Sequence, residues 1–353
     1  MTSVFTRLSL AVGATLLCGV VSAQDLHFSL IDFVPTWVNP ALTGGYEGTA
    51  RAGALYRDQS ITSGNSRAYQ TPAFFIDAPV LMLGKKAWLG VGGTVIQDAA
   101  GLARLNTTSA GASASYHRIL NESKRGGSRT VLSVGLQGGV LARSADLKST
   151  DLILAEEQEV GLGGGGLGIG SGMERQGDNF NSSGFDLGFG ASLARRLDAE
   201  RTFRIGASVR HLVAPEYSLV STGVNRPTTI SLQGGYSQLL GEGLLIEPQA
   251  FVQTTGGGFV AAQLQAMGGR FFGEDKDRLL KVGFGVRLPA RFVYPMVGFE
   301  VGDLKLAAAF DISANQLQTN AEGFQRGFEI GAQYTIKIFK EPIVERVILC
   351  PQI

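Results

Sequence analysis

The chain has 353 residues and nearly balanced charge, with 31 Lys and Arg against 30 Asp and Glu, and no basic stripe, which argues against nucleic acid as a partner. Charged residues make up 17% of the chain, below the ~25% usual for soluble domains, and its 49 glycines are about twice the ordinary ~7%. After the first 23 residues, no apolar run reaches about 18 residues, so composition excludes membrane-spanning helices and leaves transmembrane strands as the expectation.

Residues 1–23 have the pattern of a secretory signal peptide. Arg7 is the only charge, Leu8–Val21 is apolar or small, and Val21-Ser22-Ala23 forms a small-x-small cleavage site before Gln24. The alternative is a membrane anchor, but about 14 apolar residues are too few to span a ~30 Å hydrocarbon core. We therefore expect export and cleavage near Ala23-Gln24.

The next segment, residues 24–47, carries many aromatic side chains ahead of the first predicted strand. They are Phe28, Phe33, Trp37 and Tyr46. Exposing that much apolar area on a tail is costly, so we expect residues 24–47 to pack inside or beneath the sheet that follows. The alternative is that Asn39-Pro40-Ala41 only turns the chain into the first strand, since Pro fixes φ and Asn tolerates tight turns.

From about residue 48 onward, apolar and polar residues alternate in segments of roughly ten. Phe185–Leu193 and Val282–Leu288 show the pattern, which gives a strand one apolar and one polar face. A soluble sandwich would alternate in the same way. Here, however, the segments cover almost the whole chain with no second apolar layer, and the polar faces carry mainly Gly, Ser and Gln. A closed sheet in lipid satisfies every backbone polar group without leaving an edge.

We therefore predict an all-β fold, a transmembrane antiparallel up-and-down β-barrel over residues 48–338, followed by a C-terminal periplasmic tail at 339–353. The alternation gives about fourteen strands, an even number as in bacterial single-chain barrels. We expect them near 48–57, 68–78, 86–98, 105–117, 129–143, 183–195, 202–212, 227–239, 244–254, 257–271, 280–288, 292–301, 304–312 and 327–338.

The predicted connections differ in length from one rim to the other. With the N-terminus in the periplasm, the longest connections face outward, as outer-membrane barrels have them. These are 58–67, 144–182, 213–226 and 313–326, whereas the inward ones are mostly short, at 79–85, 196–201, 240–243 and 302–303. Two inward connections, 119–128 and 272–279, are exceptions of moderate length.

The 144–182 connection is our candidate for partner contact. It combines apolar residues (Leu152, Ile153, Leu154) with an acidic cluster (Glu156, Glu157, Glu159) and a glycine-rich stretch. The alternative is a surface loop that only lengthens the barrel mouth. Its glycines include one formal G-x-G-x-x-G match at Gly163, Gly165 and Gly168, but no strand precedes it and no helix follows, so we interpret it as a flexible loop.

Nothing in the sequence indicates an enzyme, a cofactor site or a metal site. His27, His117 and His211 lack metal-ligand spacing among themselves and with Cys350, the single cysteine after the signal peptide. No G-x-S-x-G motif occurs, and no histidine is placed beside a chosen nucleophile. For His117 and His211, near predicted strand ends, we expect an interfacial or hydrogen-bonding role.

Several motifs, in this order and spacing, resemble the PorP/SprF family of type IX secretion outer-membrane proteins. They are Gln24-Asp25-Leu26-His27-Phe28-Ser29, Asn39-Pro40-Ala41-Leu42-Thr43-Gly44, Tyr56-Arg57-Asp58-Gln59, Tyr69-Gln70-Thr71, Thr107-Thr108 through Ser115-Tyr116, Leu136-Gln137-Gly138-Gly139, Gly206 to Leu212, and Cys350-Pro351. Phe28, Asn39, Pro40, Ala41 and Gly44 are the family-motif residues that we single out. No Trp follows Gln59, where the family has one, which affects the detail of loop recognition.

The resemblance implies a multi-pass outer-membrane barrel of the type IX secretion and gliding machinery of Bacteroidetes. It implies that the protein assists secretion or surface anchoring of a partner protein through that partner's C-terminal domain, alongside other type IX components and outer-membrane lipid. The alternative is a passive channel or hydrophobic-solute transporter. Its selectivity would then depend on lumen residues such as Arg204, Arg210, Lys281 and Arg287.

Overall fold

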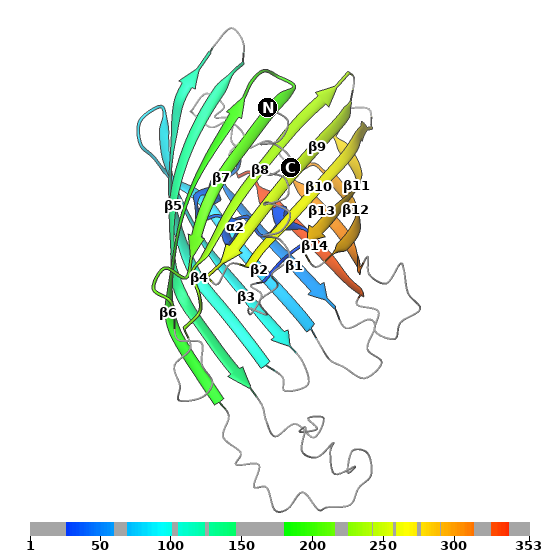
Figure 1. The fold of residues 1–353 in the computed structure, drawn as a ribbon. Helices are drawn as coiled ribbons and strands as arrows, with labels where there is room; N and C mark the ends of the chain where they lie inside the picture. The colour runs from blue at the N-terminus through cyan, green and yellow to red at the C-terminus, as the bar shows by residue number, and fades with distance from the viewer. Residues whose placement is uncertain are drawn as a thin grey trace, which may run out of the picture.

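The protein is a closed barrel of fourteen antiparallel strands, in which each strand pairs with its sequence neighbours and β1 pairs with β14 (Figure 1). The computed structural model describes residues 26–59, 69–100, 105–123, 127–145, 180–215, 225–241, 243–256, 259–273, 277–289, 291–313 and 326–338. The strands are β1 (Ala50–Asp58), β2 (Tyr69–Met82), β3 (Ala87–Ala100), β4 (Leu105–Glu122), β5 (Arg129–Ala145), β6 (Phe180–Arg196), β7 (Arg201–Arg210), β8 (Thr229–Leu240), β9 (Leu244–Thr255), β10 (Phe259–Phe272), β11 (Arg278–Leu288), β12 (Phe292–Val301), β13 (Leu304–Ser313) and β14 (Arg326–Ile336). The predicted signal peptide and the predicted tail at 339–353, with Cys350, lie outside the described residues.

The two rims of the barrel differ as the sequence predicts. We call the rim where β1 begins the turn end, and the opposite rim the loop end. Strands at the turn end are joined by short connections such as Gly302-Asp303 between β12 and β13. The loop end carries the longest connection, 146–179 between β5 and β6. The prediction of moderately long turn-end connections at 119–128 and 272–279 was wrong, because the flanking strands continue and leave only 123–128 and 273–277.

All fourteen predicted strands are present, but several run further than the alternation indicates. β4 ends at Glu122 rather than near 117, and β6 begins at Phe180 rather than near 183. In the β6 extension a polar residue faces a polar residue, as in Asn181 opposite Ser144, and in the β4 extension the register shifts between Ile119 and Asn121. In both, the ladder continues where apolar and polar residues no longer alternate regularly, so the sequence carries no clear period-two signal there.

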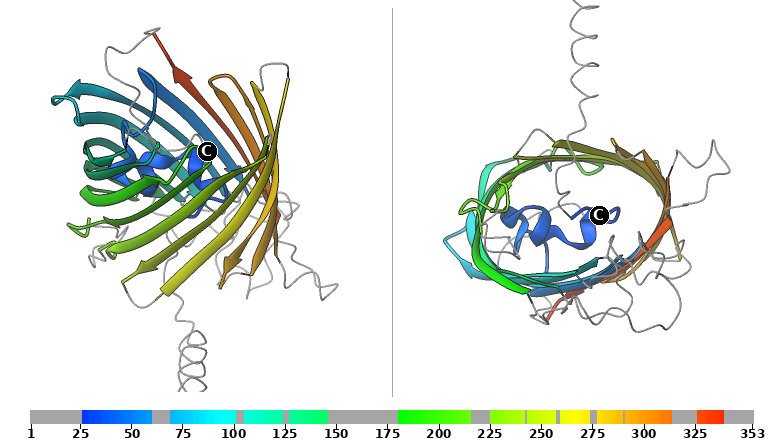
Figure 2. Two further views of the ribbon diagram at one scale, coloured as in Figure 1. Left: turned by 90° about the horizontal axis from the view of Figure 1, so that it is seen from above. Right: turned by 60° about the horizontal axis from the view of Figure 1, so that its bottom comes forward.

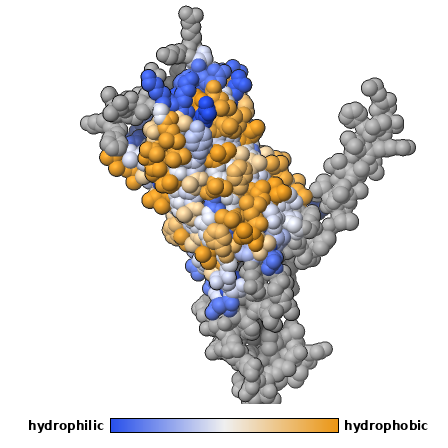
Figure 3. Space-filling model, turned by 90° about the vertical axis from the view of Figure 1, so that its left-hand side faces the viewer, coloured by the Kyte–Doolittle hydropathy of each residue, from blue (hydrophilic) through white to orange (hydrophobic). Residues whose placement is uncertain are grey.

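The alternation of faces is as predicted. Val282 and Phe284 on β11 point outward and are 60% and 63% exposed, whereas Lys281, the residue before Val282, points into the lumen and is 3% exposed. Figure 3 shows the result on one face of the molecule, where hydrophobic side chains cover the middle and hydrophilic ones gather towards the upper end. An outward apolar band with polar rims is what a strand needs in order to cross a bilayer.

The N-terminal segment lies inside the barrel, one of the two positions predicted for it (Figure 2). It folds into the 3₁₀ turn η1 (Ile31–Phe33), one turn of α-helix, α2 (Pro35–Val38), and a second 3₁₀ turn, η2 (Pro40–Leu42). We call residues 26–47 the plug. In the described part of the chain, no helix has the length and apolar character required to cross a membrane.

Candidate functional site

The plug fills the lumen through an apolar core of its own. Phe28 and Trp37 meet edge to face, with ring centroids 5.3 Å apart, and Val34 beside them is fully buried. This cluster continues into the barrel wall at residues such as Leu55 of β1 and Tyr294 of β12. Full burial of side chains of this size contributes roughly 1.5–3 kcal/mol each, which is a physical reason for the plug to stay in place.

Asn39, one of the family-motif residues, fixes the middle of the plug. Its side-chain oxygen accepts a 2.9 Å hydrogen bond from the Ala41 amide and so caps η2. Its amide nitrogen donates at 3.1 Å to the backbone oxygens of both Ala191 and Ala207, on β6 and β7. The Asn39 side chain thus stabilises the turn of the plug and also binds the plug to two strands of the wall.

The wall facing Pro40 and Ala41 has no side chain where the plug comes closest. A Cβ built on Gly135 of β5 would lie 2.4 Å from the Pro40 oxygen and 2.6 Å from the Ala41 nitrogen. A Cβ at Gly190 of β6 would overlap the Asn39 side chain. These glycines allow the backbones of plug and wall to touch, so the family motif fits a seat lined with glycine.

Gly44, the last of the family-motif residues, adopts a conformation that other residues resist. Its φ is +64°, and a Cβ there would lie 2.7 Å from the Cα of Gly90. Its amide donates at 2.7 Å to Asp77, which also forms a 2.7 Å ion pair with Arg51. Its carbonyl accepts from the Trp88 indole at 3.0 Å. The chain is thus held tightly just before it enters β1.

Tyr46 closes the plug at the turn end. Its hydroxyl donates to the Asp77 carbonyl at 2.6 Å, and the Arg51 guanidinium lies 4.3 Å from its ring centroid. Burial, together with the negative charge of Asp77, raises the pKa of the Tyr46 hydroxyl above its ordinary value. The hydroxyl therefore remains a donor at any physiological pH.

His117 supports the same stretch of the plug from β4. It does not lie at a strand end as predicted, because β4 continues five residues past it, but the expected hydrogen-bonding role is present. Its Nδ1 lies 2.7 Å from the Ser133 hydroxyl, and its Nε2 lies 2.8 Å from the Thr43 carbonyl. Its ring stacks on Trp88 with centroids 4.7 Å apart. One ring nitrogen therefore bonds the plug and the other bonds the wall.

The start of the plug is held by buried charges near the loop end. Glu329 on β14 accepts hydrogen bonds from the amides of Ser29 at 2.8 Å and Leu30 at 2.9 Å. Arg57 on β1 forms 3.3 Å ion pairs with both Glu329 and Asp311, and its guanidinium also donates to the His27 carbonyl. We call this group, with Arg287, the Ser29 charge cluster. Its carboxylates and guanidiniums neutralise one another while they fix the backbone of the plug.

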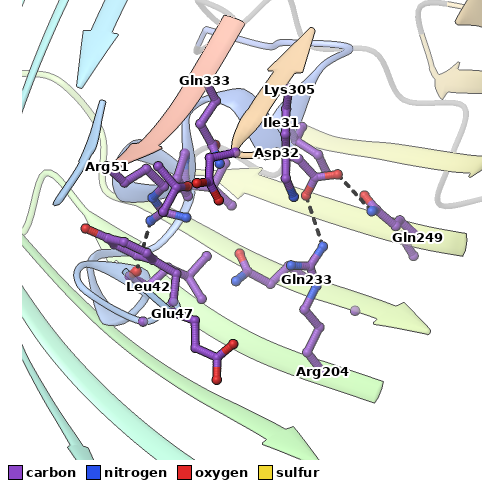
Figure 4. A pocket seen from close by; sticks show the side chains of 18 of the residues that line it. Ile31, Asp32, Leu42, Glu47, Arg51, Arg204, Gln233, Gln249, Lys305 and Gln333 are labelled. Carbon is purple, nitrogen blue, oxygen red and sulfur yellow. Dashed lines mark hydrogen bonds and ion pairs between the residues drawn. The ribbon is translucent and has the colours of Figure 1, made fainter. Parts of the chain in front are cut away.

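A polar cavity remains between the plug and the wall at the turn end (Figure 4). Asp32 of the plug bridges to Arg204 of β7 at 3.0 Å and to Gln249 of β9 at 2.8 Å. Lys305 and Glu47 also line it. Its water-accessible space is about 90 Å³, enough for a few waters.

The four lumen cations that would set selectivity in a channel each have a partner. Arg204 pairs with Asp32, and the Arg210 guanidinium lies 3.9 Å from the centroid of Trp37. Lys281 pairs with Glu247 at 2.8 Å and Glu300 at 2.6 Å, and Arg287 pairs with Asp311 at 3.3 Å. Three of them contact the plug directly, since Arg287 also donates a 2.5 Å hydrogen bond to the Ser29 hydroxyl. Lys281 is bound by carboxylates of the wall.

Sequence reasoning missed the carboxylates at the centre of this site. Asp311 and Glu329 occupy lumen-facing positions of their strands, and their sequence neighbours Phe310 and Ile330 face outward. This alternation was the signal in the sequence that could have identified them. It could not reveal their partners, because Ser29 lies 300 residues from Glu329 in the sequence. The candidate partner residues Leu152, Ile153, Leu154, Glu156 and Glu157, and the glycines at 163, 165 and 168, lie outside the described residues.

The chain resembles solved outer-membrane barrels, among them the Ralstonia pickettii toluene transporter TbuX, with 12% identity, a TM-score of 0.46 and coverage of 86% of this chain and 94% of that one. The Pseudomonas putida toluene transporter TodX is 11% identical, with a TM-score of 0.47 and coverage of 88% of this chain and 94% of that one. The KdgM porin is 6% identical, with a TM-score of 0.36 and coverage of 81% of this chain and 99% of that one. No curated protein matches.

The family comparison is more specific. A model described as type IX secretion system membrane protein PorP/SprF matches residues 20–334, which include the whole plug and all of the barrel except the last two residues of β14. An outer-membrane location accords with that family and with the barrel itself. The chain therefore belongs to the PorP/SprF family of type IX secretion system membrane proteins.

Proposed function

We propose that this barrel assists the secretion of a partner protein, or holds it at the cell surface, by binding the partner's C-terminal domain, together with other components of the type IX machinery. The observation that carries the proposal is the plugged lumen in a chain of this family. Because the interior of the barrel is occupied by its own N-terminal segment, we expect the partner to bind at the two rims. This binding is non-covalent.

In this proposal the loop end faces the cell exterior and the turn end the periplasm, after removal of residues 1–23. The loop-end connection with Leu152, Ile153, Leu154, Glu156 and Glu157 remains our candidate for contact with the partner, because apolar anchors beside charges are typical of protein interfaces. The turn end, where the cavity of Figure 4 lies, then faces the other components of the machinery in the periplasm.

The competing function, a passive channel, predicts a steady ion current. We expect the intact barrel in a planar bilayer to be electrically silent, because the plug packs inside the lumen and ion pairs bind it to the wall. Single-channel recording checks this, with a porin of known conductance as the insertion control. Stable, large conductance from the intact chain would favour the channel instead.

The proposed function itself is tested by deleting the gene. We expect the deletion strain to lose at least one specific protein from its surface and medium while other secreted proteins remain, because the barrel serves a particular partner. Quantitative proteomics of the surface and medium fractions measures this. A plasmid copy of the gene must restore the missing protein, and an unchanged surface proteome would contradict the proposal.

A further inference from the structure

The barrel has a step in its rim at the loop end, between β6 and β7. β5 pairs with β6 along its full length, from Arg129 opposite Arg196 to Ala145 opposite Phe180. On its other side, β6 pairs with β7 only from Phe189 to Arg196. Among the described residues, no strand pairs with that edge of Phe180–Asp186. This leaves seven residues, or about 24 Å of strand at ~3.4 Å per residue, which we call the β6 edge.

The step arises because β7 turns away from the sheet at His211. His211 has a φ of +59°, a conformation that a non-glycine residue seldom adopts, and Ala214 follows with +44°. The His211 ring bonds Asp186 at 2.9 Å, and the Leu212 amide gives the Leu187 carbonyl a last 3.0 Å hydrogen bond. Local backbone strain of this kind persists where the surroundings hold it and often marks a functional position.

The last hydrogen bond also shows which backbone groups the β6 edge presents. In antiparallel pairing, one residue directs both its N–H and its C=O to the same neighbour, and the next residue directs them to the other side. Since the Leu187 carbonyl points toward β7, Phe185, Ser183 and Asn181 direct their donors and acceptors to the open side. Each can therefore exchange two hydrogen bonds with an added strand.

The β6 edge starts at the margin of the apolar band, at Phe185, and continues beyond it to Phe180. On the outer face, Phe185 is 58% exposed and Val140 of β5 is 50% exposed, and both are suited to lipid. Past them the outward residues become small and polar, as at Ser183 and Ser144, around a hollow of about 300 Å³. A sheet wall of this composition stands in water, where a protein partner can reach it.

Proteins normally protect a free edge with proline, lysine or a covering segment, because it invites pairing with another chain. Phe180–Asp186 reads Phe-Asn-Ser-Ser-Gly-Phe-Asp and contains neither proline nor lysine. We propose that the β6 edge binds an extended segment of the partner's C-terminal domain by strand addition, with main-chain hydrogen bonds from Asn181, Ser183 and Phe185. The inference rests on the proposed function and assigns the contact with the partner's C-terminal domain to the β6 edge at the loop end.

The test uses the full-length barrel in detergent and the purified C-terminal domain of whichever protein the deletion strain fails to display. Ser183→Pro removes an amide that points to the open side and leaves the hydrogen bonds to β5 intact, since Gly184 and Asp186 make those. We expect Ser183→Pro to weaken binding about tenfold or more and Ser183→Ala, the matched control, to stay within about twofold. Heat-modifiable migration in gel electrophoresis confirms that each variant is folded.

Hydrogen exchange gives a second measurement that needs no variant. The amides of Ser183 and Phe185 should exchange rapidly in the free barrel and slowly in the complex, whereas the Gly184 amide, paired with β5, is protected in both. Unchanged exchange at Ser183 and Phe185, or unchanged affinity of a folded Ser183→Pro barrel, overturns the inference. So does a barrel dimer that Ser183→Pro dissociates, because the edge would then pair with a second copy.

The two proposals fail in different ways. If deletion of the gene leaves the surface proteome unchanged, the proposed function is wrong. If a surface protein is lost, and its C-terminal domain binds wild-type and Ser183→Pro barrels equally, only the assignment to the β6 edge is wrong.

Discussion

Replacing Glu329 with alanine is expected to lower the free energy of unfolding of the barrel by about 3–5 kcal/mol. Glu329 is 1% exposed and compensates Arg57, which is itself buried, while it accepts the amides of Ser29 and Leu30. Its removal leaves a buried guanidinium short of a partner and two backbone donors unsatisfied. The start of the plug should then detach from the Ser29 charge cluster.

Urea titration in detergent, followed by tryptophan fluorescence, measures the change, since Trp37 and Trp88 are both buried. Glu200→Ala is the matched control, because Glu200 lies in the exposed turn before β7 and its side chain can be truncated within about 0.5 kcal/mol. A Glu329→Ala barrel as stable as the Glu200→Ala barrel would show that the cluster does not hold the plug.

Gly135→Ala is expected to destabilise the barrel by about 1–3 kcal/mol, since its methyl group would collide with the plug backbone at Pro40 and Ala41. Both neighbours of that methyl are main-chain atoms, which cannot rotate aside as a flexible side chain would. We also expect proteinase K to cleave the plug faster in this variant, because the family motif can no longer sit against β5.

Gly138→Ala, three residues along the same strand, provides the control. Its new methyl would point outward and find its nearest neighbour, Leu187, at an ordinary 3.6 Å. Both variants add one methyl group to β5. A difference between them in stability or in cleavage rate is therefore due to the contact between Gly135 and the plug. Equal stability and equal cleavage of the two variants would contradict the close contact described for Gly135.

The strands could be predicted from the sequence because lipid enforces a period of two over each crossing. Val282 and Phe284 had to face outward, and Lys281 inward, whatever the rest of the chain did. The prediction ended too early at Glu122 and began too late at Phe180, where strands leave the hydrocarbon. The β6 edge begins in one of these extensions, at 180–182, and its other residues fall within the predicted strand 183–195. The alternation therefore predicted most of this segment as strand, but it could not show that no described strand pairs with one side of it.

The interior of the barrel was predictable only in outline. The aromatic residues of the plug indicated that it would pack, and Phe28 and Trp37 do so. The anchoring of Ser29 by Glu329 could not be predicted, because nothing local to either residue refers to the other. The sequence showed that the polar faces are rich in glycine, but it could not show that Gly135 and Gly190 each make room for a particular atom of the plug.

The pairing of β1 with β14 has a consequence for how the molecule is assembled. Ser29 is bound by β13 and β14, the last strands of the sheet, while Gly44 is bound by β2 and β3, near its beginning. The binding site for Gly44 therefore needs only neighbouring strands to have paired. The site for Ser29 needs Glu329 of β14 beside Arg57 of β1, so it exists only when the barrel is closed.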